Sequence, residues 1–186
     1  MRRLLVLSLS LLGCASSSGG GAPADPAAAV DRVLLIDERG RVYRSAANSP
    51  LAAEQTVPGT VQQAVQALVG SYEELGLSVS SIDWANGRVG VRVPMAPRRI
   101  GGQPIARYVD CGTNHMGEPR ANSYAVTLSV QSSATPAAAG EVLMTTLASA
   151  TARQQGVSSD PLNCPTLGVL EKRVNTLAAE RIAAAK

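Results

Sequence analysis

The chain has 186 residues, enough for one domain with a usable core, and its 45% apolar content excludes a disordered chain. Phe is absent and aromatic residues make up only 3%, so the core must be built from Val, Leu, Ile and Ala. The formal charge of +3 falls to +1 once Arg2 and Arg3, which belong to a predicted leader, are removed. The charge balance therefore singles out no partner and gives no indication of nucleic-acid binding.

Residues 1–13 predict an export signal. Arg2 and Arg3 form a short positive region, and the apolar run LLVLSLSLL follows at residues 4–12. A largely apolar stretch of nine residues suits the hydrophobic part of a secretory signal and is too short to span a bilayer. We therefore expect this segment to direct export and then to be removed.

Cys14 ends the segment Leu11-Leu12-Gly13-Cys14, which resembles the lipobox of bacterial lipoproteins. The resemblance implies that a diacylglycerol is attached to Cys14 and that a dedicated peptidase cleaves just before it, although the family more often has a smaller residue at position 12. The alternative is an ordinary signal peptide cleaved after Ala15. Two or three acyl chains hold a protein on a bilayer durably. Because Ala15 rather than Asp follows the cysteine, the resemblance also implies delivery to the outer membrane.

Residues 14–30 are predicted to form the lipidated cysteine and a flexible tether, since Gly, Ser, Pro and Ala dominate without apolar periodicity. Residues 31–186 are then expected to form a single domain. Residues 33–36 and 41–45 flank an acidic, Gly-containing turn and predict a small hairpin.

Residues 60–76 predict the first amphipathic helix. Apolar residues recur at positions 61, 64, 65, 68, 69, 72 and 75, which is the helical period, with glutamines and Glu73 between them. Thr60 is a suitable N-cap and Gly76 a suitable helix stop.

Several strands are predicted after this helix. Residues 77–84 and 88–94 flank Asn86-Gly87, a strong hairpin signal, and a Pro/Gly-rich loop at 94–104 precedes an expected strand over Ile105–Cys111. Residues 124–131 alternate between apolar and polar side chains. Residues 141–153 also alternate, which favours a strand, although their alanine content would suit a helix.

A second amphipathic helix is predicted over residues 167–182, because Leu, Val, Ala and Ile recur there at helical spacing among charged side chains. The order of elements predicts an α+β fold in which two helices cover an antiparallel sheet of about four to six strands. Over residues 61–182 this architecture resembles the globular modules of accessory lipoproteins of the outer-membrane barrel-assembly machinery, the NlpB/DapX type. That resemblance carries no specific motif and no active site.

Cys111 and Cys164 remain as an even pair once Cys14 is assigned to lipid, and an exported chain meets an oxidising compartment. We therefore expect a disulfide, with a nucleophilic Cys111 served by His115 as the alternative. Because His115 is the only histidine, no metal site is expected. The sequence Asp110-Cys111-Gly112, with a cysteine before a terminal helix, also resembles a family of uncharacterised envelope lipoproteins.

Five arginines within 20 residues that contain no acidic side chain form a candidate site for anionic partners: Arg88, Arg92, Arg98, Arg99 and Arg107. Guanidinium groups suit carboxylates and phosphates, so an acidic envelope protein or an anionic envelope polymer would qualify as partner. The alternative is a solvated strand face.

The sequence contains no Gly-rich phosphate loop between a strand and a helix, no Gly-x-Ser-x-Gly and no His-Glu-x-x-His, and we expect no cofactor and no catalytic residue. These observations favour a lipid-anchored envelope protein that is not an enzyme and that binds or scaffolds another component. The alternatives are a periplasm-facing, hydrolase-like enzyme and a purely structural tethered module.

Overall fold

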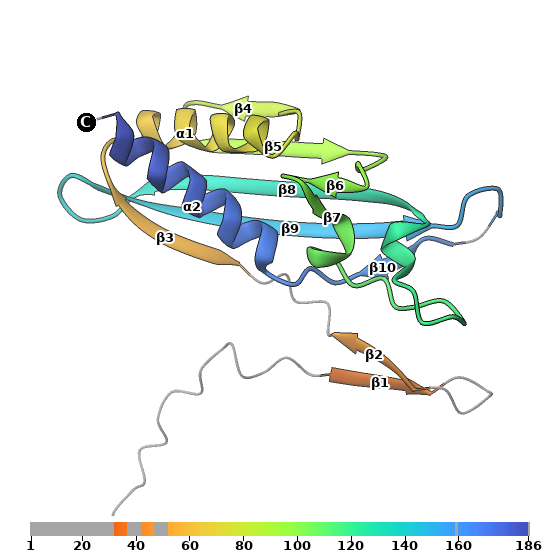
Figure 1. The fold of residues 1–186 in the computed structure, drawn as a ribbon. Coiled ribbons are helices and arrows are strands. Elements are labelled where there is room, and N and C mark those ends of the chain that lie inside the picture. Colours follow the sequence, from red (N-terminus) through yellow and green to blue (C-terminus); the bar gives the residue numbers. More distant parts are fainter. Residues whose placement is uncertain (1–31, 37–41, 47–51, 159, 186) are drawn as a thin grey trace, which may run out of the picture.

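The structure is a computed structural model that describes residues 32–36, 42–46, 52–158 and 160–185 (Figure 1). The predicted leader, lipobox and tether, including Cys14, lie outside the described residues. Strands β1 (Arg32–Ile36) and β2 (Val42–Ala46) pair antiparallel with each other, as the predicted hairpin requires. The turn predicted between them also lies outside the described residues.

The main sheet is antiparallel and has six strands, which confirms the predicted α+β fold class. Its strands are β3 (Ala53–Pro58), β4 (Ser81–Asp83), β5 (Arg88–Val93), β8 (Ala125–Pro136), β9 (Glu141–Arg153) and β10 (Leu162–Cys164). The order is β10-β9-β8-β5-β4. Two strands pair with the same edge of β9: β3 with residues 141–146 and β10 with residues 150–152. Every second residue of β9 is buried, which is the pattern of a strand with one buried face. The strand predicted over residues 141–153 is therefore confirmed, in spite of the alanine content.

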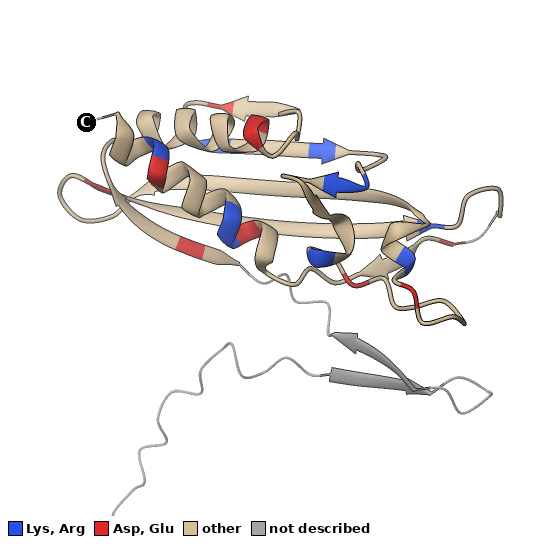
Figure 2. Cartoon of the chain, viewed as in Figure 1, with Lys and Arg blue, Asp and Glu red and all other residues tan. Residues whose placement is uncertain are grey.

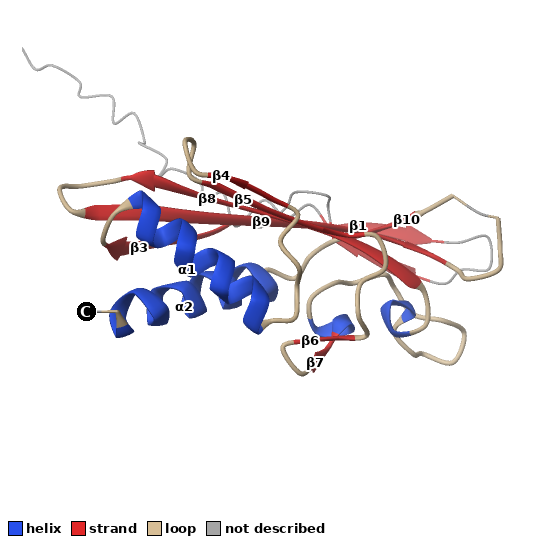
Figure 3. Ribbon diagram, turned by 90° about the horizontal axis from the view of Figure 1, so that it is seen from above, coloured by secondary structure: helices blue, strands red, loops and turns tan. Residues whose placement is uncertain are grey.

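Both helices pack against one face of this sheet, α1 (Val61–Glu74) on β5 and β8 and α2 (Val169–Ala184) on β3 and β9 (Figure 3). The predicted cap of α1 is confirmed: the Thr60 hydroxyl accepts from the Gln63 backbone N–H, and the Gln63 side chain accepts from the Thr60 N–H. Gly76 follows the helix with φ 74°, a left-handed conformation that glycine adopts without strain.

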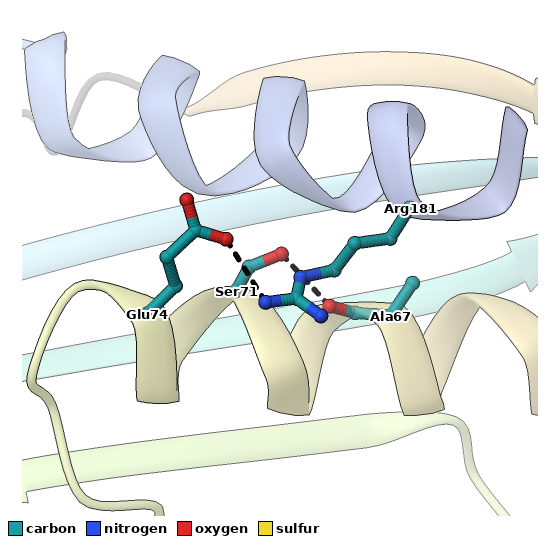
Figure 4. A network of polar contacts seen from close by, with 4 residues as sticks. All are labelled: Ala67, Ser71, Glu74 and Arg181. Atoms are coloured by element: carbon teal, nitrogen blue, oxygen red, sulfur yellow. Dashed lines mark hydrogen bonds and ion pairs between the residues drawn. The ribbon is translucent and has the colours of Figure 1, made fainter. Parts of the chain in front are cut away.

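The two helices approach each other at Gly70. A Cβ atom there would lie 2.9 Å from Nη1 of Arg181, so the missing side chain leaves room for the guanidinium of α2. Arg181 Nη2 also lies 2.9 Å from Oε2 of Glu74, and Figure 4 shows this ion pair reaching across the helices. Both side chains are about half exposed, so the ion pair contributes little to stability.

The predicted strand over Ile105–Cys111 is wrong in its first half. After the short hairpin β6 (Arg99–Ile100) and β7 (Gln103–Pro104), residues Ile105–Arg107 form a 3₁₀ helix, η2. The buried residues are Ile105, Tyr108 and Val109, and this i, i+3, i+4 spacing belongs to a helical turn rather than to an alternating strand. A second 3₁₀ helix, η3, spans Arg120–Asn122.

Cys111 and Cys164 form a disulfide with Cα atoms 4.5 Å apart. Val109 pairs antiparallel with Thr166, and the Asp110 N–H donates to the Pro165 carbonyl, so the two cysteines are opposed in the same register. This is a non-hydrogen-bonded position, where opposed Cα atoms are closest. Cys111 therefore lies in a loop beside β10 and not at the end of the strand predicted over Ile105–Cys111.

A chain of buried polar side chains crosses the core from α1 to β3. Tyr72 Oη lies 2.5 Å from Ser132 Oγ, Ser132 Oγ lies 2.6 Å from Thr146 Oγ1, and Thr146 Oγ1 donates to Oδ1 of Asn175 at 2.6 Å. Asn175 Nδ2 donates to the Ala53 carbonyl at 2.9 Å.

The donor and the acceptor of each hydrogen bond in this buried chain follow from its last members. Because the one hydroxyl proton of Thr146 goes to Asn175, Ser132 must donate to Thr146, and Tyr72 must then donate to Ser132. Burial is the main cause that raises the pKa of Tyr72, so the phenol keeps the proton that this arrangement needs.

Glu171 lies one turn before Asn175 in α2 and is fully buried. Among the described residues, no hydrogen bond of acceptable length and angle reaches either of its carboxyl oxygens or the hydroxyl of the nearby Thr166. Burial is the largest cause that raises the pKa of Glu171, although the Thr166 hydroxyl, its own N–H and the Ala148 backbone act in the opposite direction. Burial therefore favours the protonated, uncharged acid.

Replacing Ser132 with alanine tests the buried chain. Ser132→Ala removes the acceptor of Tyr72 and the donor to Thr146, so we expect the free energy of unfolding to fall by about 1–3 kcal/mol. Ser133→Ala, on the next residue but on the other face of β8, is the matched control and should change it by less than about 0.5 kcal/mol. Urea denaturation measures both, and equal losses would contradict the assignment.

The pH dependence of stability tests Glu171. Because its pKa is higher in the folded than in the unfolded protein, the folded state holds the proton more tightly, and stability falls as the pH rises above the ordinary value of 4.5 towards the raised value. Glu171→Gln removes this loss. We expect the variant to have the higher melting temperature at pH 7.5 and the advantage to shrink or vanish at pH 4. An advantage that is the same at both pH values would contradict a raised pKa.

Candidate binding surface

The open face of the main sheet is the face opposite α1 and α2, and none of the described helices covers it (Figure 3). Its residues alternate with the buried ones along each strand. On β4, β5, β8 and β9 it presents Ser81, Asp83, Arg88, Gly90, Arg92, Thr127, Ser129, Gln131, Ser133, Thr135, Leu143, Thr145, Leu147, Ser149, Thr151 and Arg153. Serine and threonine hydroxyls are the commonest groups on it, so this face offers hydrogen-bond donors and acceptors.

A hollow of about 580 Å³ lies in the open face, over β4, β5, β8 and β9. Gly90 lines the hollow, and it stands between Arg88 and Arg92 in the outward row of β5. A Cβ atom at Gly90 would come within 2.5 Å of Ser81 Oγ, so the glycine admits the serine of the paired strand. Around it lie Asp83, Gln131 and Ser133 among others.

Asp83 is the acidic residue among those that line the hollow. The Asn86 side chain donates to Oδ2 at 2.7 Å and its backbone N–H to Oδ1 at 3.1 Å. These bonds, the side-chain one first, lower the pKa of Asp83, and the charge of Arg88 on the paired strand acts in the same direction. A carboxylate and a guanidinium therefore lie side by side in the hollow.

The loop that holds Asn86 is the predicted hairpin turn, and it depends on Gly87. That glycine has φ 62°, and a Cβ atom on it would lie 2.3 Å from the Ala134 carbonyl oxygen. The strand before the turn is shorter than predicted, since pairing begins at Ser81.

The five candidate arginines lie in different environments. Figure 2 shows where Lys and Arg lie along the ribbon. Arg88 and Arg92 share the open face. Arg98 instead donates to the carbonyls of Asn122 and Ser123, and Arg99 donates to the Gly102 carbonyl at 2.7 Å. These two arginines therefore have local structural roles.

Arg107 is the fifth candidate and lies in η2, on the side of the sheet that carries the helices, and not on a strand beside β5. There it lines a smaller depression together with Arg173 of α2. The sequence pattern missed Arg173, which lies 66 positions later in the chain. It also missed the hollow, because the lining residues come from four strands and a turn that lie far apart in the sequence.

The chemistry on the open face is that of recognition. Asp83, Arg88, Gln131 and several hydroxyls could hydrogen-bond a polar ligand, but His115 lies on another loop and not in the hollow. Cys111, the alternative nucleophile, is bound in the disulfide. Among the described residues, no group of three or more His, Cys, Asp or Glu side chains is placed to hold a metal ion.

No helix in the described part of the chain combines the length and the apolar character needed to cross a membrane. Comparison of the sequence with models of protein families and with curated protein sequences finds no match.

Proposed function

We propose that this chain is a lipid-anchored protein of the cell envelope that binds or scaffolds another envelope component through the open face of its sheet. The observation that carries the proposal is a six-stranded sheet with helices on one face only and a hollow, polar, arginine-bearing surface on the other. Sheets that pack on one side commonly expose the other to water or to a partner. An acidic envelope protein or an anionic envelope polymer suits Arg88 and Arg92.

The anchor in this proposal is Cys14. Its support is the lipobox resemblance together with the pairing of Cys111 with Cys164, which leaves Cys14 as the odd cysteine of the chain. Ala15 favours the outer membrane. Lipid on Cys14 would hold the domain at the bilayer surface, where the open face meets other envelope components.

A hydrolase-like enzyme is the competing function. It would gather titratable groups of shifted pKa in one concave site. Within the described residues, the shifted groups are Tyr72 and Glu171 inside the core and Asp83 beside a turn, on three separate elements. This distribution favours binding over hydrolysis.

Substitution of Cys14 tests the anchor. We expect Cys14→Ser to abolish incorporation of radiolabelled palmitate in growing cells and to move the protein out of the membrane fraction. Ser17→Ala is the control and should retain both label and membrane location. A wild-type mature chain that begins at Ser16 and carries no lipid would contradict the anchor while leaving the binding proposal open to its own test.

Charge reversal on β5 tests the open face. Because Arg88 and Arg92 are both exposed on the outward row, Arg88→Glu/Arg92→Glu should fold normally and lose the envelope partners that the wild type retains in an affinity pull-down. Lys172→Glu/Arg173→Glu carries the same charge change on α2, and we expect it to retain them. An unchanged set of partners in the β5 variant would remove the open face as the binding surface.

A further inference from the structure

A second depression, of about 260 Å³, lies on the helix side of the sheet, away from the open face. We call it the arginine depression. It is lined by Gly101, Gln103, Arg107, Tyr108, Val169 and Arg173. Its walls are therefore the turn between β6 and β7, the 3₁₀ helix η2 and the first turns of α2.

Backbone contacts fix these walls relative to one another. The Gly101 N–H donates to the Leu75 carbonyl, which ties the β6–β7 turn to the end of α1. The Leu167 N–H donates to the Tyr108 carbonyl, which holds the start of α2 beside η2. The disulfide joins Cys111, three residues after Tyr108, to Cys164, three residues before Leu167. The two arginines thus project from a framework that is already in place, which lowers the entropic cost of binding.

The arginine depression is electropositive. None of its lining residues is acidic, and within the described part of the chain neither Arg107 nor Arg173 has a carboxylate within salt-bridge distance. Both side chains are exposed, so their donors are free to bind a ligand. Two guanidinium groups on either side of one depression suit a phosphate, because each can donate two parallel hydrogen bonds to its oxygens.

Two exposed apolar side chains lie at the start of α2, one of them in the wall of the depression. Val169, in the wall of the depression, is 42% exposed, and Leu167, just before α2, is 43% exposed. A free phosphate would gain nothing from them, whereas a ligand that combines a phosphate with hydrocarbon chains would cover them. Burial of apolar surface contributes about 25 cal/mol per Å², so this contact would add to the affinity for an amphiphile.

We propose that the arginine depression binds the phosphate of an anionic membrane lipid, with Arg107 and Arg173 on the headgroup and the acyl chains against Val169 and Leu167. The proposal does not rest on the function assigned to the open face, since it concerns residues on the other side of the sheet. It holds whether or not Cys14 carries lipid.

Titration of the full chain with soluble short-chain lipids tests the site. The probes are dihexanoylphosphatidylglycerol, dihexanoylphosphatidylcholine and inorganic phosphate, all below micelle-forming concentrations, followed by calorimetry. We expect the phosphatidylglycerol to bind at least about tenfold more tightly than either of the others, because only it combines an anionic headgroup with apolar chains. Its affinity should fall with added salt.

Two pairs of variants separate the contributions. Arg107→Gln/Arg173→Gln should weaken phosphatidylglycerol binding by about tenfold or more, while Arg88→Gln/Arg92→Gln, with the same charge change on the open face, should leave it unchanged. Leu167→Ser/Val169→Ser should weaken binding of the lipid but not of inorganic phosphate. Circular dichroism of each variant establishes that it is folded.

Three results would overturn the proposal. Equal affinity for the two lipids would exclude headgroup recognition, and inorganic phosphate binding as tightly as the lipid would identify a free-anion site. Equal losses in the two arginine pairs would show attraction to overall charge and not to this depression. Failure here leaves the partners of the open face untouched, and loss of those partners leaves lipid binding untouched.

Discussion

The buried chain from Tyr72 to the Ala53 carbonyl fixes how the helices lie on the sheet. Its members come from α1, β8, β9, α2 and β3, so a single run of hydrogen bonds joins both helices to three strands. Each hydroxyl has one proton, and each proton has one acceptor. An apolar contact tolerates a small slide of one element past another, whereas this arrangement does not, because a slide would leave buried polar groups unpaired.

The same chain also fixes which face of the sheet is buried. Ser132 and Thr146 are the polar exceptions among the inward residues of β8 and β9, which are otherwise Val, Leu, Ala and Met. A one-residue slip of either strand would turn every inward side chain outward. The residues between the inward ones point to the open face, and most of them are serines and threonines. The register that buries the core residues therefore also produces the hydroxyl-rich surface.

The sequence predicted those elements in which one periodicity dominates. The α1 helix with its Thr60 cap, the β9 strand and the second helix were predicted because burial at helical or alternating spacing runs through each of them. Ile105–Cys111 was predicted wrongly because its buried residues fit a helical turn first and an extended segment afterwards. Local pattern could not resolve this change, since the contact between Tyr108–Asp110 and Pro165–Leu167 joins residues more than 50 positions apart.

The candidate sites also show that a local sequence pattern does not predict which residues meet in space. Five arginines within 20 residues of sequence separate into an exposed pair on β5, two that bond to nearby carbonyls and one in η2. The cause is the segment after β5, which takes the chain to the helix side, where β6 and β7 lie (Figure 3). Arg107 then lies near an arginine that no local pattern connects with it. The two surfaces are consequently on opposite sides of one sheet, so a ligand on either leaves the other accessible. A chain held at a bilayer through the arginine depression would turn its open face away from the lipid and towards whatever else lies at the membrane.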